Sequence, residues 1–468
     1  MALIQERIID VDVMLVGGGN AALCAAIEAR LAGCSVAVFE AAPKFYRGGN
    51  TRHTRNCRLA HDGPAATMLS AYSEEEFWDD LLRVTGGNTD PDLAQYTIAQ
   101  SKQLLEWLLR QGVGFQPSLG GTLSLDRTNA FFLGGGRSML NSLYRTAERL
   151  GIELYYDHEV VGLEIDGDTF HGATVKTPEG NIGVKAKSLV AACGGFEANI
   201  EWLKQYWGDA ADNFVVRGTA YNRGSVLRML LDQGVQPVGD PRQCHAIAVD
   251  ARAPKFDAGI ITRLDCILFG MVVNANAERF YDEGEDFWPK RYAIWGRLIA
   301  DQPGQAAFAI FDRPKLDRFM PSLYRPIEAP SIGELALKLG LDPAKLVATV
   351  ERFNSAIQPG HYDNTILDDC RTEGLVPPKS HWALPLTEAP FYAYPLRPGI
   401  TFTYLGTRVD RSARMQMQSG KAATNMFAAG EVMAGNVLGR GYLAGIGMTI
   451  GSVFGRIAGQ EAARYVRS

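Results

Sequence analysis

The sequence contains few of the features that mark metal-cluster or nucleic-acid-binding proteins. Its seven cysteines form no Cys-x-x-Cys pair and no cluster, which argues against iron–sulfur clusters, structural zinc and any other bound metal. Scattered cysteines of this kind indicate a reduced chain without disulfides. No run of Lys and Arg stands out and the net charge is −5, so nucleic acid is not an expected partner.

Long apolar runs are also missing. The longest, residues 443–454, contains glycines and is too short to cross a bilayer. The first residues carry Glu6, Arg7, Asp10 and Asp12 where a secretory signal would be apolar. We therefore expect no signal peptide, no direct membrane span and a cytoplasmic location. The 468 residues, 46% of them hydrophobic, are enough for two or three ordinary globular domains.

What the sequence does contain is a strong motif in residues 12–40. An apolar run at residues 13–16 ends in three glycines, and an Ala-rich segment leads to a second apolar run at residues 36–39. This order predicts a strand, a tight turn, a helix and a second strand, the arrangement that opens a nucleotide-binding α/β domain.

The glycine turn predicts dinucleotide binding. Gly17 and Gly19 fill the first two positions of the G-x-G-x-x-G pattern, and Ala22 takes the third, where a small residue is enough. Such a turn lets the backbone approach a pyrophosphate, and a helix that begins near Asn20 directs its N–H groups toward it. Glu40 follows Gly19 at the distance where an acid binds the adenosine ribose hydroxyls.

Three further stretches extend this pattern along the chain. Residues 43–63 are dense in Gly, Arg and Asn, which predicts a loop along the cofactor. An apolar run at residues 188–193 ends in a glycine pair, typical of a buried parallel strand whose end passes close to a ligand. An apolar strand at residues 424–429, followed by a glycine-rich turn and a helix, resembles the missing final part of a flavin-binding domain.

The segments at residues 13–40, RGGNT at 47–51, AAGEV at 428–432 and GNVLGRGYLAGIGM at 435–448 together resemble one family. It is the flavoprotein subunit family of fumarate reductase and succinate dehydrogenase, and the resemblance covers essentially the whole chain. It implies an α/β fold, with a Rossmann-like FAD-binding domain of the glutathione-reductase type and an inserted α+β capping domain. The expected boundaries are 1–240 and 400–468 for the two parts of the FAD-binding domain and 241–399 for the capping domain, where Pro, Trp and Tyr become frequent.

The resemblance also implies FAD and the residues that bind it. These are Gly17, Gly18, Gly19, Asn20, Ala21, Glu40, Gly49, Asn50, Thr51, Val160, Gly194, Gly195, Gly430, Glu431, Gly445, Ile446, Gly447 and Met448. Covalent members of the family attach the flavin through a His, and Asn50 occupies that position here, so noncovalent FAD is expected. His53 is the nearest rival for a flavin bond.

By the same resemblance, the substrate is a dicarboxylate or a tricarboxylate that loses a proton from one carbon and a hydride from the next, toward flavin N5. Such a substrate calls for Arg and His, because they hold carboxylates in place. The residues implied to bind or act on it are His245, Thr262, Arg263, Arg291 and Arg440. Arg291 takes the family's proton-transfer role, with Lys290 as an alternative because the alignment passes an insertion there.

Two features of the site depart from the family pattern, the proton relay and the second substrate His. Arg263 and Cys266 stand where the family has an acid and an Arg in its proton relay, and Phe402 replaces a second substrate His. A rebuilt site in which Arg263 meets a third carboxylate would suit a tricarboxylate, but an exposed Arg263 is an equal alternative. A fumarate-type reductase, a ring-ketone dehydrogenase of the ketosteroid type and a flavin redox module without its own substrate also remain open.

The sequence also limits the route by which electrons can leave the cofactor. The chain has no cluster-binding or haem-attachment motif, and its single Rossmann-type turn is assigned to FAD. Relatives in the family pass electrons to a separate iron–sulfur protein. The resemblance therefore implies a separate electron-accepting partner of the iron–sulfur or membrane type, through which this chain would be peripheral to the inner membrane.

Overall fold

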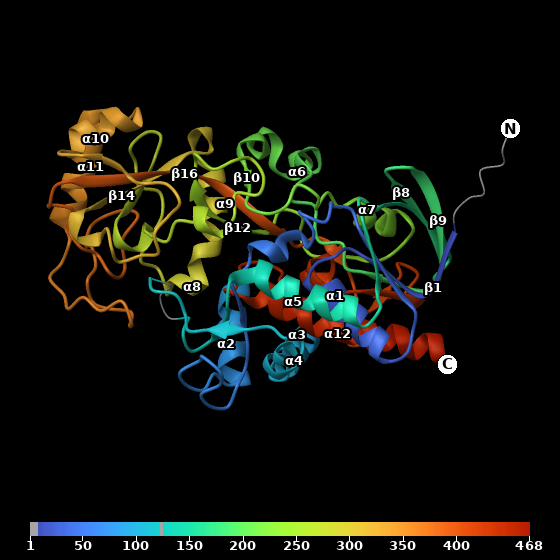
Figure 1. Cartoon of the computed structure of the whole chain (residues 1–468). Coiled ribbons are helices and arrows are strands. Elements are labelled where there is room, and N and C mark those ends of the chain that lie inside the picture. The colour runs from blue at the N-terminus through green and yellow to red at the C-terminus, as the bar shows by residue number, and fades with distance from the viewer. Residues whose placement is uncertain (1–7, 122–124) are drawn as a thin grey trace.

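The computed structural model describes residues 8–121 and 125–468, and it folds them mainly around two sheets (Figure 1). The strands of the first sheet are β1 (Ile8–Val16), β2 (Val36–Glu40), β6 (Glu153–Tyr156), β7 (Glu159–Asp166), β8 (Thr169–Thr177), β9 (Gly180–Ala191), β18 (Arg414–Gln416) and β19 (Ala422–Ala428). Their order is β18-β19-β9-β1-β2-β6, and β8 and β7 extend from β9 as an antiparallel meander.

The centre of the first sheet is parallel, because β19, β9, β1, β2 and β6 all run in one direction. β1 and β2 are nearly continuous apolar runs, as expected for parallel strands covered on both faces. The carboxyl ends of these strands therefore lie along one edge, which is where open α/β sheets bind ligands.

Two long helices, α1 (Asn20–Leu31) and α12 (Ile446–Arg467), pack against each other beside this sheet (Figure 1). Their close approach depends on glycines of α12. A Cβ on Gly455 would lie 2.5 Å from the carbonyl oxygen of Ala21, and one on Gly459 would lie 2.2 Å from that of Ala25. This packing brings the N-termini of both helices, from opposite ends of the sequence, to the same edge of the sheet.

The second sheet lies toward the other end of the molecule (Figure 1). Its strands are β10 (Val215–Val216), β12 (Cys244–Asp250), β13 (Met271–Asn274), β14 (Ala307–Asp312), β15 (Ile327–Ala329) and β16 (Phe391–Thr403). β16 pairs with β10, β12, β14 and β15, and continues to Thr403 beside the first part of the fold. The second sheet includes β10 and the end of β16, which lie outside the expected capping domain of residues 241–399. The boundaries at 240 and 399 therefore stay a prediction.

Smaller elements complete the fold. A three-stranded sheet contains β3 (Asn56–Arg58), β4 (Phe115–Gln116) and β5 (Asn129–Phe132), and a two-stranded one contains β11 (Pro237–Val238) and β17 (Gly406–Thr407). The other helices are α2 (Glu74–Thr85), α3 (Pro91–Ser101), α4 (Leu104–Arg110), α5 (Gly135–Arg149), α6 (Ile200–Trp207), α7 (Ser225–Asp232), α8 (Trp288–Arg291), α9 (Trp295–Ala300), α10 (Ile332–Leu339) and α11 (Pro343–Ala356). Within the described residues, no helix combines the length and the apolar character needed to cross a membrane.

Candidate active site

A large cavity opens at the carboxyl ends of the parallel strands. It encloses about 1500 Å³ of empty space, part of it open to solvent. Gly17 follows β1, Glu40 ends β2, Gly194 follows β9 and Gly430 follows β19, and all four line it. The other lining residues that the sequence predicts for FAD are Gly18, Gly19, Asn20, Ala21, Gly49, Asn50, Thr51, Val160, Glu431, Gly445, Gly447 and Met448.

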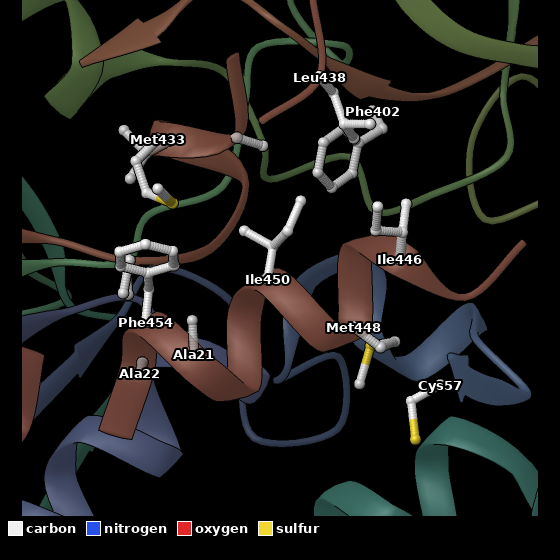
Figure 2. Packing of buried hydrophobic residues seen from close by; sticks show 14 of the residues in the cluster. Ala21, Ala22, Cys57, Phe402, Met433, Leu438, Ile446, Met448, Ile450 and Phe454 are labelled. Carbon is white, nitrogen blue, oxygen red and sulfur yellow. The ribbon is translucent and has the colours of Figure 1, made fainter. Parts of the chain in front are cut away.

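Two predicted FAD residues do not line this cavity. A Cβ on Gly195 would lie 2.2 Å from Glu431 Oε1, so the bare glycine leaves room for that carboxyl behind the cavity wall. Ile446 is buried, and its side chain extends from the first turn of α12 toward Phe402 (Figure 2). Ile450, one turn further along, extends the same way, so this face of α12 packs against the end of β16.

The glycine turn has the shape of a phosphate cradle. Gly17 has φ +103°, and a Cβ on it would lie 2.4 Å from the carbonyl oxygen of Ala192. Gly19 caps α1 without a side chain and the first turn of α1 contains no acid, so the helix presents free N–H groups and a positive dipole end. A Cβ on Gly19 would meet nothing closer than 3.4 Å, because the space beside it is the cavity. These features fit the pyrophosphate of FAD.

Glu40 lies where an adenosine ribose would be bound. Its carboxylate accepts hydrogen bonds from the backbone N–H of Ala42 at 2.9 Å and of Gly48 at 3.4 Å. Burial raises the pKa of the Glu40 carboxyl above its ordinary value, and these two hydrogen bonds act against that rise. Tyr144 donates to the carbonyl oxygen of Gly18 at 2.7 Å, which ties helix α5 to the glycine turn.

Asn50 is held on every side by protein groups. Its Nδ2 donates to Glu197 and, at 2.6 Å, to the carbonyl oxygen of Thr401, while its Oδ1 accepts from the N–H of Thr219 at 2.8 Å. The rival residue His53 also lines the cavity, and its Nε2 lies 2.8 Å from Asp257 Oδ1. An amide at position 50 lacks the nucleophilic ring nitrogen that a covalent flavin link of the His type requires.

We therefore expect FAD to be released when the protein is denatured. Acid precipitation of purified protein should leave the flavin in the supernatant, with an absorbance equal to that of the native sample. A pellet that stays yellow, or a fluorescent band on a denaturing gel, would contradict this prediction and would direct attention to His53.

The sequence predicted Glu431 as a cofactor-binding residue but not the buried carboxyl of its neighbour Glu197. Glu197 is fully buried and accepts from Asn222 Nδ2 at 2.7 Å, and Glu431 accepts from the backbone N–H of Thr403 at 2.8 Å. Burial raises the pKa of both carboxyls, and the proximity of Glu197 raises that of Glu431 further. Two carboxyls so placed cannot both ionise readily, which favours the protonated form of Glu431.

Away from the glycine turn, the cavity is bordered by a stack of aromatic rings. His245, on β12, lies face to face with Tyr442 at a centroid distance of 3.9 Å and edge-on to Tyr292 at 5.5 Å. Burial lowers the pKa of His245 well below its ordinary value, and Arg217 and Arg263 lower it further. The imidazole is therefore neutral, and its buried Nε2 has no hydrogen-bond partner among the described residues.

Three buried arginines surround this stack. Arg263, which follows a short turn at Ile260–Thr262, donates from Nη2 to Asp265 at 2.7 Å and lies 4.5 Å from the centre of the Tyr292 ring. Arg55 and Arg217 also line the cavity, and the sequence argument named neither of them. The loop at residues 43–63 was expected along the cofactor and includes Arg55, whereas no sequence signal indicated Arg217.

The substrate-binding role expected for Arg440 stays a prediction, although this side chain is not part of the cavity lining in the structure. It is exposed, and its guanidinium lies against Gly86 at the end of α2, outside the cavity lining. The neighbouring Tyr442 lines the cavity instead. The flanking glycines do allow a bend at Arg440, but the bend directs the side chain toward α2.

Arg291 and Thr262 also lie outside the cavity lining. Arg291 Nε lies 3.3 Å from Glu285 Oε2, and Lys290 forms an ion pair with Asp80. Thr262 is buried, and its hydroxyl donates to a backbone carbonyl at 2.9 Å. The proton-transfer role expected for Arg291 or Lys290 stays a prediction, and Tyr292 is the residue of this helix region that lines the cavity.

Comparison with known proteins agrees with the cofactor site. The family described as FAD binding domain matches residues 12–448. An NADH:fumarate oxidoreductase of Klebsiella pneumoniae (strain 342) is 28% identical over 97% of this chain and 48% of its own length, so this chain spans about half of that relative. A probable fumarate reductase of Shewanella frigidimarina (strain NCIMB 400) is 28% identical over 97% of this chain and 75% of its own.

Solved structures show the same fold. The open conformation of a flavocytochrome c3 fumarate reductase has a TM-score of 0.76 at 23% identity, over 98% of this chain and 79% of its own. A 3-ketosteroid-Δ4-(5α)-dehydrogenase of Rhodococcus jostii RHA1 has a TM-score of 0.72 at 22% identity, over 98% of both chains. With its phosphate cradle, its parallel sheet and a family match over most of its length, the chain belongs to the FAD-binding flavoprotein family of fumarate reductase and succinate dehydrogenase.

Proposed function

We propose that this FAD-dependent oxidoreductase is a dehydrogenase that converts tricarballylate to cis-aconitate. The observation that carries the proposal is the set of buried polar nitrogens beside the aromatic stack that have no partner among the described residues, in particular Arg263 Nε and His245 Nε2, which is a donor in the Nε2–H tautomer. Buried donors without partners are costly, so their presence favours an anionic ligand that accepts from them. The segments GITFTYLG at 399–406 and VGGGNAALCAAIEA at 16–29 resemble tricarballylate dehydrogenases and support this choice of polycarboxylate.

The reaction removes two hydrogens from adjacent carbons. FAD, when bound, supplies a two-electron acceptor for the hydride. His245 is neutral and offers a single N–H donor, while Arg263 is oriented by Asp265 and offers its free Nε–H. Together they would fix two carboxylates of the substrate before the C–H bonds break.

The proton that leaves the first carbon needs an acceptor, and we assign that role to Tyr292. The residue is buried and lines the cavity. Burial raises the pKa of Tyr292, and Arg263, Arg217 and Arg55 act against that rise. The hydroxyl is therefore protonated at rest and must first release its own proton to the solvent in the cavity. The three cations lower the cost of forming the phenolate, which then accepts the proton from the substrate carbon.

The electrons would leave through a separate partner. Relatives include an NADH:fumarate oxidoreductase that is twice the length of this chain, so the remaining redox parts of such a system would lie on other polypeptide segments. We propose an iron–sulfur or membrane-associated acceptor, with this chain located in the cytoplasm or peripheral to the membrane through that partner.

A ring-ketone dehydrogenase is the second candidate, because Tyr292, Tyr442 and Phe402 give the cavity an aromatic border and two 3-ketosteroid dehydrogenases have the same fold. A neutral steroid, however, would leave the buried arginines and His245 without a partner. Reduction of a fumarate-like alkene by the reduced flavin is a further alternative reaction for the same site.

One anaerobic experiment separates these candidates. Purified yellow protein is mixed with tricarballylate, succinate, citrate or a 3-ketosteroid, and the flavin absorbance is recorded. We expect rapid bleaching with tricarballylate and slow or no bleaching with the others. Bleaching by the steroid alone would replace the proposal with the second candidate, and no bleaching by any of them would favour a redox module without its own substrate.

A further inference from the structure

We propose that Arg55 and Arg217 form a subsite for a third substrate carboxylate and thereby select tricarboxylates over dicarboxylates. The inference rests on the proposed function, because it concerns the same cavity. It adds two residues and a specificity to the site. His245 and Arg263 would bind two carboxylates, and the two further guanidiniums would bind the third.

Arg217 is the better fixed of the two. Its Nε donates to Thr401 Oγ1 at 2.8 Å, which orients the guanidinium, while Nη1 is buried and has no partner among the described residues. The residue is 5% exposed and lines the cavity beside the end of β16. A guanidinium with one edge anchored and the other free can bind a carboxylate with little loss of side-chain freedom.

Arg55 reaches the same region from the loop before β3. Its Nη1 lies 3.1 Å from the sulfur of Met320, a weak acceptor, and its buried Nη2 has no partner among the described residues. The residue is 7% exposed. Burial lowers the pKa of Arg55 to about 9 and that of Arg217 to about 10, and nearby Arg263 contributes to both shifts.

The local charge balance is the reason to expect a further anion. Arg55, Arg217 and Arg263 repel one another, and Asp265 is the carboxylate that acts on all three. Both oxygens of Asp265 are already engaged, one by Arg263 and the other by Trp288 Nε1 at 2.7 Å. Arg55 and Arg217 are thus left without a counter-ion of their own among the residues that the structure describes, an arrangement that is costly until an anion binds.

The number of donors matches a tricarboxylate better than a dicarboxylate. A ligand with two carboxylates, held by His245 and Arg263, would leave the buried nitrogens of Arg55 and Arg217 unpaired. A third carboxylate would accept from the free nitrogens of both. Sites that are built to pair a ligand group reject analogues that lack it, because their own buried groups then stay unpaired.

The test uses the oxidised holoenzyme and two unsaturated ligands that do not reduce the flavin, cis-aconitate with three carboxylates and fumarate with two. Dissociation constants are measured by calorimetry and by perturbation of the flavin spectrum. The variants are Arg217→Gln and Arg55→Gln. A third variant, Arg217→Lys, keeps the positive charge but removes the planar guanidinium. Arg242→Gln removes an exposed charge three residues before His245 and is the control.

We expect Arg217→Gln and Arg55→Gln each to weaken cis-aconitate binding by roughly 10- to 100-fold, the range for a lost hydrogen bond to a charged group. Fumarate binding should change by less than about threefold, since its carboxylates use the other donors. The dissociation constant of cis-aconitate for Arg217→Lys should lie between those of the wild type and Arg217→Gln. The constant for Arg242→Gln should match that of the wild type. Arg55 and Arg217 lie on different segments of the chain. If one of the two variants fails to fold, the other still tests the proposed subsite.

Three outcomes would overturn the inference. The variants could weaken the binding of cis-aconitate and of fumarate by the same factor, which would mean that the arginines act only through the general positive potential of the cavity. The variants could lose FAD while the ratio of the two dissociation constants stays constant, which would assign them to the cofactor. In the third outcome, the dissociation constants of both ligands stay at their wild-type values in the variants. Failure of the wild-type protein to bind either ligand would instead reject the proposed function, so the two failures are distinguishable.

Discussion

A folded protein without FAD is the expected product of Gly19→Val. The backbone at Gly19 has φ −78°, which a branched residue can adopt, and its added Cβ would meet only Thr51 Oγ1 at 3.4 Å and the carbonyl oxygen of Gly48 at 3.6 Å. The side chain would therefore extend into the cavity where the pyrophosphate must approach the N-terminus of α1. Gly17→Val would be a poorer test, because its positive φ and its contact with Ala192 would strain the fold itself.

The measurement compares flavin content and thermal unfolding for Gly19→Val with those of Gly63→Val. A Cβ on Gly63 would have no atom within 4 Å, and the residue lies outside the cavity lining. Gly63→Val should retain a full complement of FAD. If Gly19→Val purifies yellow with wild-type FAD retention, the glycine turn is not the phosphate site.

The second large effect is expected for Tyr292→Phe. Removal of the hydroxyl keeps the ring between His245 and Arg263 but removes the proposed proton acceptor. The rate of flavin reduction by substrate should fall by about 10²- to 10⁴-fold, the usual range for loss of a general base, while the affinity for cis-aconitate stays near that of the wild type.

Arg291→Ala is the matched comparison, because its guanidinium pairs with Glu285 outside the cavity. Its rate of flavin reduction should stay near that of the wild type. The opposite pattern, a large loss in Arg291→Ala with a normal rate in Tyr292→Phe, would restore the role that the sequence resemblance gave to Arg291. A large loss in Lys290→Ala instead would point to the alternative alignment.

The nucleotide-binding part of the fold was predictable because local signals agree with one another there. The apolar run that becomes β1 is closed by glycines, and a helix and a second apolar strand follow within a short distance. The start of α3 follows a local signal of the same kind: Asp90 stands before Pro91 and its side chain accepts from the backbone N–H groups of Asp92 and Leu93, a common N-terminal cap.

Longer-range features were less predictable. The buried strand expected at residues 188–193 begins earlier, as β9 (Gly180–Ala191), because pairing with β1 and β8 on its two sides keeps the whole segment extended. Residues 74–110 form three helices, α2, α3 and α4, and Gly86 in a left-handed conformation ends the first of them.

The substrate end of the cavity was the hardest part to predict. Arg55 and Arg217 come from separate loops, and nothing in their local sequence indicates that tertiary packing will bury both beside Tyr292. The direction of the Arg440 side chain was equally hard to predict, since the direction of a side chain in a glycine-rich turn depends on what packs against the turn. The sequence therefore indicated which chemistry to expect but not all of the residues that surround it.

A single anaerobic turnover tests the central claim most directly. Stoichiometric tricarballylate is added to the oxidised protein, flavin bleaching is followed, and the quenched mixture is analysed for organic acids. The account predicts one cis-aconitate for each flavin reduced, followed by arrest until an artificial electron acceptor is added. Bleaching without cis-aconitate, or steady anaerobic turnover with NAD or NADP alone at the rate of the dye assay, would contradict it.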